Sequence, residues 1–413
     1  MKLYGQIAQT ALFRILAVFC GVVFTVMTAR LLGPEGRGLL ATLVTLVSGI
    51  CIAFHFSLAY IAVQRIGSAP PADKHRLSQV AFGVLTTVLL LSTVITWTVF
   101  ALLVAAGQLN SRAIPLPILC LGMILIPFLL WEGYSSLLLG AIGRLDADNK
   151  AVFAGKLLTL AGGVLLLSAG AGVVGALLAT LAGACFSAWM TLLVLVRELG
   201  LPRPGRWADV RAYLHDGAKL HFNAVATFLS LGVDVLFVAN LASIGSAGVY
   251  QVGTQIVSAL MIIPASMAAV FYSRTAAVGY AAGWTEKHRL IVWSMLVFTA
   301  TALALYQTAS FWVALLFGAQ FFQLNDLVGI QLMTFVFLAF SQIMSPQWVA
   351  RGFFKRMSAI AVALAVISLL LNAMLVPVWG NVGAALVRLL CAGLGAGINV
   401  YMFLRFDAEM KRA

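Results

Sequence analysis

The chain has 413 residues, of which 62% are hydrophobic and 9% are charged, and its net charge is +13. Soluble domains carry about 25% charged residues, so this composition excludes an ordinary soluble protein and indicates a chain that lies in lipid along most of its length. The five cysteines form no CxxC motif, which predicts neither a disulfide framework nor a zinc site.

Apolar runs of about 20 residues, each long enough to cross a bilayer as a helix, follow one another along the chain. The first run is too long for the hydrophobic core of a cleaved signal peptide, so we expect it to remain as the first span. The sequence therefore predicts an all-α membrane protein with about twelve transmembrane helices, over residues 8–31, 38–63, 79–106, 115–140, 151–169, 173–196, 217–241, 247–273, 290–317, 326–350, 357–377 and 382–404.

A polar turn separates the first two predicted spans, in the stretch ARLLGPEGRGLLA over residues 29–41. Gly33 and Pro34 favour a tight turn, and Glu35 can offset the charge of Arg30 or Arg37. Two interpretations remain open: a purely structural turn, or contact of Arg30 or Arg37 with a substrate.

The basic residues are unevenly distributed between the two sides of the predicted spans. If the amino terminus is cytoplasmic, 22 of the 26 lysines and arginines fall on cytoplasmic loops and helix ends. The exceptions are Arg30, Arg37 and Arg112 on the opposite side and Arg388 within the last span. This bias follows the positive-inside rule and predicts that both termini are cytoplasmic. The same basic loops explain the net charge, because they orient the protein and can contact anionic lipid headgroups. We therefore expect no nucleic-acid partner.

The two halves of the sequence match each other in three places, in the same order. Ala29, Leu31, Gly38, Val47 and Ser48 match Ala239, Leu241, Gly248, Val257 and Ser258; Gly140 and Arg144 match Gly352 and Arg356; and the segment 172–184 matches 380–392. Such a repeat of six helices predicts two pseudo-symmetric bundles. We place them at 1–196 and 217–413, joined by a basic cytoplasmic linker over 197–216.

The turn motif LLGPEGRG resembles the signature of polysaccharide flippases, the Wzx-like branch of the multidrug/oligosaccharidyl-lipid/polysaccharide (MOP) exporter superfamily. Its counterpart NLASIGSAGVYQVG, over residues 240–253, is also similar to that family. The resemblance implies a MATE-like fold that flips an undecaprenyl-diphosphate-linked oligosaccharide across the bacterial cytoplasmic (inner) membrane by alternating access. It also implies glycan polymerase and glycosyltransferases as partners.

Six ionisable residues are candidates for positions deep inside the predicted spans, where each costs about 2.5–3.5 kcal/mol unless it faces a cavity or a partner. They are Arg14, His55, Glu132, Lys156, Asp234 and Arg388. We predict Asp234, Glu132 and His55 as candidates for ion coupling, with Asp234 first. A static ion pair of Asp234 with Arg388 and a histidine hydrogen-bonded to a neighbour are the structural alternatives. Glu132 is expected to neutralise Arg14, Lys156 or a cation on the substrate.

Polar residues recur at helical spacing on four of the spans, which puts those of each helix on one face. These rows are Asn223, Thr227, Ser230 and Asp234; Thr45, Ser48 and His55; Gln251, Gln255 and Ser258; and Gln331, Thr334, Ser341 and Ser345. They are interpreted as the lining of a polar lumen, although single hydroxyls and amides also serve as contacts between helices.

Three cationic candidates lie near the cytoplasmic ends of the first and seventh spans, namely Arg14, Lys219 and His221. A guanidinium at such a position can bind a diphosphate through paired hydrogen bonds, and the resemblance to family members with basic lumens implies the same role. The alternative is that these side chains extend to the lipid headgroups.

The sequence contains neither a GxxxxGK[ST] nor an HExxH motif. We therefore expect no enzyme activity and no cofactor. Transport would take its energy from an ion gradient, the membrane potential or the substrate gradient. The alternatives are a cation-coupled drug or metabolite antiporter of the same superfamily, a lipid II flippase, which usually has more helices, and a non-transporting scaffold for glycan assembly.

Overall fold

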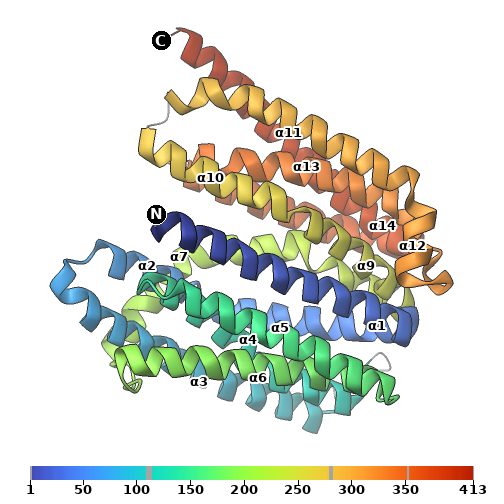
Figure 1. Ribbon diagram of the computed structural model, residues 1–413. Coiled ribbons are helices and arrows are strands. Elements are labelled where there is room, and N and C mark those ends of the chain that lie inside the picture. The colour runs from blue at the N-terminus through green and yellow to red at the C-terminus, as the bar shows by residue number, and fades with distance from the viewer. Residues whose placement is uncertain (1, 108–113, 279–281, 351–352, 413) are drawn as a thin grey trace. The chain divides into compact units, whose positions relative to one another are not determined.

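A computed structural model describes residues 2–107, 114–278, 282–350 and 353–412, and within these ranges it contains helices and no β-strand (Figure 1). The predicted all-α fold is confirmed. Arg112 and Gly352, used above for orientation and for the repeat, lie outside the described residues. The helices are α1 (Lys2–His55), α2 (Leu58–Ser68), α3 (Pro71–Ala105), α4 (Leu116–Ala141), α5 (Leu145–Ser168), α6 (Gly172–Leu199), α7 (Trp207–Leu231), α8 (Asp234–Leu241), α9 (Ile244–Leu260), α10 (Ile262–Val278), α11 (Ala282–Gln307), α12 (Ala309–Phe317), the 3₁₀ helix η1 (Ala319–Phe321), α13 (Leu324–Ala350) and α14 (Phe354–Arg412).

Within the described residues, nine helices are long and apolar enough to cross a membrane, or ten if the bent pair α7 and α8 is one span. Two of the candidate spans, Leu12–His55 in α1 with 44 residues and Arg356–Phe406 in α14 with 51, have about twice the length that one crossing needs. Both break internally, at Gly33 and at Gly380. Counting each as a pair of crossings raises ten to the predicted twelve.

Glycines with a positive φ produce these breaks. Gly33 has φ 69° and is followed by Pro34, which confirms the predicted turn at this position. Gly380 has φ 56°, and its repeat counterpart Gly172, where α6 begins, has the same φ of 56°. Each half therefore has a glycine of positive φ at the start of its last helix, at positions that the sequence match pairs.

Four predicted spans are interrupted, and the seventh span breaks after Leu231, between α7 and α8. The second span breaks at Phe56 and Ser57, which have left-handed φ values of 44° and 52°, so that α1 ends at His55 and α2 follows. The eighth span breaks at Met261 between α9 and α10, and the ninth at Thr308 between α11 and α12. Apolar composition alone does not reveal these breaks, because the residues on both sides are equally apolar.

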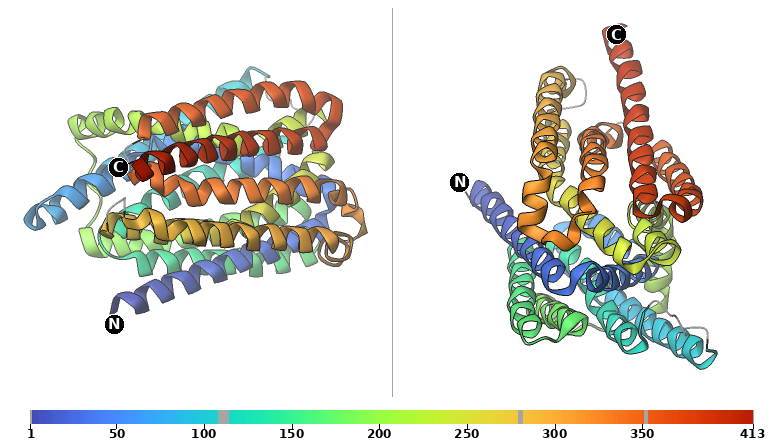
Figure 2. Two further views of the ribbon diagram at one scale, coloured as in Figure 1. Left: turned by 90° about the horizontal axis from the view of Figure 1, so that it is seen from above. Right: turned by 90° about the vertical axis from the view of Figure 1, so that its right-hand side faces the viewer.

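The chain forms two compact units, each of which is described by itself. Unit 1 comprises the residues up to Leu32 and Leu39–Val225, and unit 2 comprises Gly33–Gly38 and the residues from Ala226 onward. In unit 1, α4 packs against α2, α3, α5 and α6, and in unit 2, α13 packs against α9, α10, α11 and α14. The further views show these helices running side by side within their units (Figure 2).

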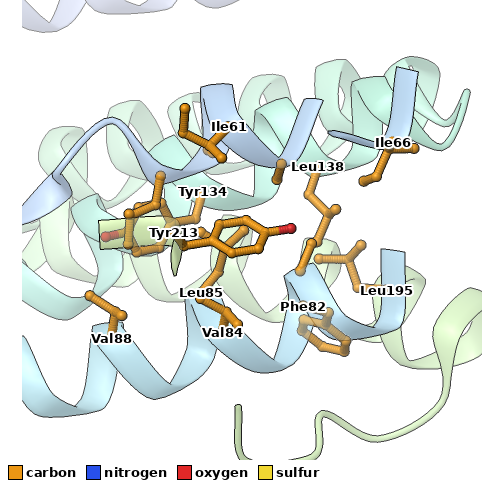
Figure 3. Close-up of a cluster of buried hydrophobic side chains, with 14 of the residues drawn as sticks. Ile61, Ile66, Phe82, Val84, Leu85, Val88, Tyr134, Leu138, Leu195 and Tyr213 are labelled. Carbon is orange, nitrogen blue, oxygen red and sulfur yellow. The ribbon is translucent and has the colours of Figure 1, made fainter. Parts of the chain in front are cut away.

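A cluster of buried side chains holds α2, α3, α4, α6 and the first turns of α7 together in unit 1 (Figure 3). Tyr213 of α7 is only 1% exposed and lies in this cluster with Phe82, Leu85 and Tyr134. Residues 207–216 of the predicted linker are thus the beginning of a continuous helix packed into unit 1. The predicted division at 196 and 217 stays a prediction.

The segment Gly33–Gly38 packs against the first turns of α9 within unit 2. A Cβ atom at Gly38 would overlap the carbonyl oxygen of Ile244, and a Cβ at Gly248 would overlap the carbonyl oxygen of Pro34. Gly38 and Gly248 are repeat counterparts, and both are glycine because the two backbones approach too closely for a side chain.

Candidate functional site

Unit 1 contains a cavity of about 590 Å³ between the second half of α1, α4, α5 and α7. Its polar lining consists of Ser48, His55, Ser57, Glu132, Ser136 and Lys156. Ser48 and His55 lie two helical turns apart on α1, and Glu132 and Ser136 lie one turn apart on α4, so each pair shares a helix face. Helical periodicity therefore places these polar residues on the inner side of their helices.

An acidic and two basic side chains of this cavity are available for a ligand. The side chains of His55, Glu132 and Lys156 make no hydrogen bond or ion pair with any residue that the structure describes. The predicted neutralisation of Glu132 by Arg14 or Lys156 is therefore not formed. The cavity presents a carboxylate, an ammonium group and an imidazole.

His55 is held at the break between α1 and α2 by its neighbours in unit 1. Its ring stacks on that of Tyr134 with a centroid distance of 5.0 Å. The Tyr134 hydroxyl lies 3.3 Å and 3.2 Å from the carbonyl oxygens of Phe54 and His55, to which it donates. Those carbonyls lose their helical partners at the break, so Tyr134 stabilises the left-handed residues that follow.

Arg14 of α1 is exposed, and its Nε donates to Asn149 Oδ1 at 3.3 Å. The adjacent Asp148 is buried and accepts a hydrogen bond from Ser136 Oγ at 2.8 Å. Ser136 lines the cavity, whereas Arg14 does not. A polar chain thus runs from the surface of α1 through α5 to the cavity wall on α4.

Unit 2 contains a second cavity, of about 470 Å³, between the end of α7, α9, α13 and α14. Its polar lining is uncharged except for one residue, Arg388. The uncharged members are Thr227, Ser230, Ser258, Ser341, Gln342, Ser345 and Asn399. Three of the polar rows predicted from the sequence thus contribute to the same cavity.

Arg388 is paired inside unit 2. Its Nη1 lies 3.3 Å from Asp234 Oδ2 and donates to the carbonyl oxygen of Leu231 at 3.0 Å, and the Tyr250 hydroxyl donates to the same Asp234 oxygen. The Asp234 and Arg388 side chains are 3% and 9% exposed. Asp234 also lies in the first turn of α8, where the helix dipole favours a negative charge. The static ion pair considered from the sequence is the arrangement in the structure.

Comparison with known proteins identifies the family. The model of a family described as "Polysaccharide biosynthesis protein" matches residues 6–272 of the chain. The chain belongs to this polysaccharide biosynthesis protein family. The comparison with curated proteins gives no match.

Solved structures share the fold of this polysaccharide biosynthesis protein at low sequence identity. It is similar to the lipid II flippase MurJ in an inward closed conformation, with a TM-score of 0.77, 12% identity, and coverage of 97% of this chain and 87% of that one. It is also similar to a multidrug resistance MATE family transporter of the MOP superfamily. The inward-facing conformation gives a TM-score of 0.68 at 14% identity, covering 98% of this chain and 96% of that one. The outward-facing conformation gives a TM-score of 0.65 at 15% identity, with the same coverage. This is a multi-pass membrane protein with the fold of MurJ and the MATE transporters.

Several predicted site residues line neither cavity of this family member. Arg30 is exposed on α1, and Lys219 is exposed on α7 with its Nζ 3.4 Å from Asp216 Oδ1. His221 stacks on Phe56 with a centroid distance of 5.0 Å. The others are Asn223, Gln251, Gln255, Asp234 and Arg14.

The predicted row from Asn223 to Asp234 is not straight. α7 ends at Leu231, and α8 begins at Asp234 with a bend of 43°. Thr227 and Ser230 therefore line the cavity of unit 2. Asp234 does not line it, but it pairs with Arg388, which does. Gln251 instead accepts a hydrogen bond from Arg37 Nη2 at 2.7 Å, which gives Arg37 a structural role in unit 2.

Sequence reasoning missed Asn399 and Tyr250, which organise the cavity of unit 2. Asn399 follows Arg388 by eleven residues and therefore lies on the same face of α14, a spacing that could have indicated it. In the sequence, Tyr250 is indicated only as part of the motif over residues 240–253 that resembles the flippase family. Its contact with Asp234 depends on the fold, because a bend separates the two helices that carry them.

Proposed function

We propose that this protein is a flippase that moves an oligosaccharide linked to undecaprenyl diphosphate from the inner to the outer leaflet of a bacterial cytoplasmic membrane. The family match over residues 6–272 carries the proposal. Polar cavities in both units support it, because a glycan headgroup needs hydrogen-bonding groups that lipid does not offer. The fold shared with a lipid II flippase agrees with it.

The transport mechanism in this proposal is alternating access, in which the protein exposes its polar site to one side of the membrane and then to the other. The likeness to both an inward-facing and an outward-facing transporter supports this step, since one fold then serves both states. The polyprenyl tail would remain in lipid throughout. The substrate is moved without chemical change, so the protein is not an enzyme.

We further propose that an ion gradient or the membrane potential drives transport through His55 and Glu132. Both line the unit 1 cavity and lack a partner among the described residues, so each is free to bind a proton or a cation. Asp234 fits this role less well, because Arg388 already balances its charge. Both termini would be cytoplasmic, and glycosyltransferases and a polymerase would act before and after transport.

Deletion of the gene in its own host tests the proposal. A flippase predicts that the lipid-linked oligosaccharide accumulates on the cytoplasmic leaflet while surface polysaccharide is lost, and that the wild-type gene restores both. Lys156→Gln should fail to restore them, because it removes the ammonium group of the unit 1 cavity. Lys150→Gln is the matched control, since Lys150 lies on the same helix outside the cavity.

Two outcomes would contradict the proposal. An antiporter predicts altered drug or metabolite export with normal surface polysaccharide. A non-transporting scaffold predicts that Lys156→Gln restores the polysaccharide as well as wild type does.

A further inference from the structure

The cavities of the two units differ in charge. That of unit 1 presents Glu132, Lys156 and His55, none of which pairs with another described residue. That of unit 2 presents hydroxyl and amide groups around a single arginine. The two sites therefore suit different chemical groups.

Arg388 is charge-balanced by Asp234 in this arrangement, although its buried Nε makes no hydrogen bond with a described residue. Its Nη1 is shared between the carboxylate of Asp234 and the carbonyl oxygen of Leu231. An incoming phosphate would have to compete with a buried carboxylate that is also held by Tyr250. The unit 2 cavity consequently offers no net positive charge to a diphosphate.

The amide of Asn399 is fixed in orientation. Its Oδ1 accepts a hydrogen bond from Trp348 Nε1 at 2.6 Å, and its Nδ2 donates to the carbonyl oxygen of Gly395 at 2.8 Å and contacts Ser341 Oγ at 3.4 Å. Trp348 is fully buried. Both amide hydrogens of Asn399 are thereby engaged, so the wall made of Asn399, Ser341 and Ser345 presents two hydroxyl groups and the remaining lone pair of Asn399 Oδ1 at set positions.

Gly395 belongs to the same wall. It lines the cavity between Arg388 and Asn399, and a Cβ there would lie 3.6 Å from Leu364 Cδ1 and 3.9 Å from Ser341 Oγ. On α9, Ser258 also lines the cavity and donates its hydroxyl hydrogen to the carbonyl oxygen of Thr254 at 2.9 Å, which leaves its oxygen lone pairs as acceptors. The cavity therefore combines donors and acceptors without net charge.

We propose that the unit 2 cavity binds uncharged sugar residues of the lipid-linked glycan, through their hydroxyl and acetamido groups, and does not bind the diphosphate. Dense neutral donors and acceptors match sugar hydroxyls, each of which both donates and accepts. The volume of about 470 Å³ is within the range of small-molecule pockets. This inference rests on the proposed function and assigns the sugar and the diphosphate to different places.

The test measures binding of two ligands to the full-length protein in lipid nanodiscs. One ligand is undecaprenyl diphosphate without sugar, and the other is the same carrier bearing the host's own oligosaccharide. Wild type should bind the glycosylated carrier more tightly. The double variant Ser341→Ala/Ser345→Ala should lose roughly fivefold in affinity for each lost hydrogen bond to the sugar, with affinity for the bare carrier unchanged.

A second variant and a control distinguish a loss of sugar binding from misfolding of the serine double variant. Asn399→Leu should reduce the preference for the glycosylated carrier in the same way. Asn240→Leu should leave it unchanged, because Asn240 is exposed on α8 outside the cavity. The glycosylated carrier should also change the tryptophan fluorescence of wild type, and Trp348→Phe should remove that change because Trp348 bonds directly to Asn399.

The possible failures are distinguishable. Equal losses for both ligands in the serine double variant, or an unchanged preference in both cavity variants, would overturn the sugar site. Equal affinity of wild type for the two carriers would also overturn it, while leaving a flippase that holds only the diphosphate. Binding of neither carrier by wild type would refute the proposed function itself.

Discussion

Replacing Asp234 by asparagine tests whether this residue serves structure or ion coupling. The substitution keeps the size of the side chain and removes its charge, which leaves Arg388 buried without a counter-ion. At the observed separation of 3.3 Å, the attraction between the two groups is about 5 kcal/mol for an effective dielectric constant near 20. Breaking such a buried pair from one side costs about 3–5 kcal/mol of stability. We expect a loss of about 3 kcal/mol, because Leu231 still accepts a hydrogen bond from Arg388.

The assay is equilibrium unfolding of the purified protein in lipid–detergent micelles, with the double variant Asp234→Asn/Arg388→Met as the partner measurement. Removing both charges eliminates the uncompensated guanidinium, so the double variant should be more stable than Asp234→Asn alone. Wild-type stability of Asp234→Asn, combined with lost translocation, would refute the structural role and return Asp234 to ion coupling. Additive losses in the double variant would show that the two residues do not act as a pair.

Three further substitutions follow from the fold and the unit 1 cavity. Gly38→Val should destabilise the protein by about 1–3 kcal/mol or prevent folding, because its Cβ would overlap the carbonyl oxygen of Ile244; expression and unfolding measure this, and unchanged stability would contradict the close approach. Tyr134→Phe should cost about 1 kcal/mol in the same unfolding assay through loss of its hydrogen bond at the break after His55, and no loss would mean that the hydroxyl does not hold the break. His55→Gln should slow translocation driven by an imposed pH gradient, because it removes the imidazole from the unit 1 cavity, whereas an unchanged rate would exclude His55 from coupling.

The fold was largely predictable, because each span has to satisfy its own backbone and be apolar over its length. Gly33 and Pro34 marked a turn that the structure contains, and the match of Gly172 with Gly380 predicted two equal helix starts. The break at Phe56 and Ser57 was not predictable from local sequence. Both residues adopt a positive φ without being glycine, and contacts from Tyr134 on another helix hold the segment in place.

For the candidate site, the sequence indicates which residues line a cavity better than it indicates which of them lie together. Helical spacing correctly grouped Ser48 with His55, and Thr227 with Ser230, on cavity-lining faces. It extended the row to Asp234 because a straight helix was assumed, and the bend after Leu231 cannot be read from polar spacing. The pairing of Asp234 with Arg388 joins residues separated by 154 positions, so only the tertiary fold determines which charges meet.

Translocation of a lipid-linked oligosaccharide in reconstituted vesicles tests the central claim most directly. Vesicles containing the purified protein should make the glycan on the inner leaflet accessible to an external glycosidase, faster with an imposed pH gradient than without one, while protein-free vesicles keep it protected. Equal protection of the glycan in vesicles with and without the protein, under both conditions, would contradict the account.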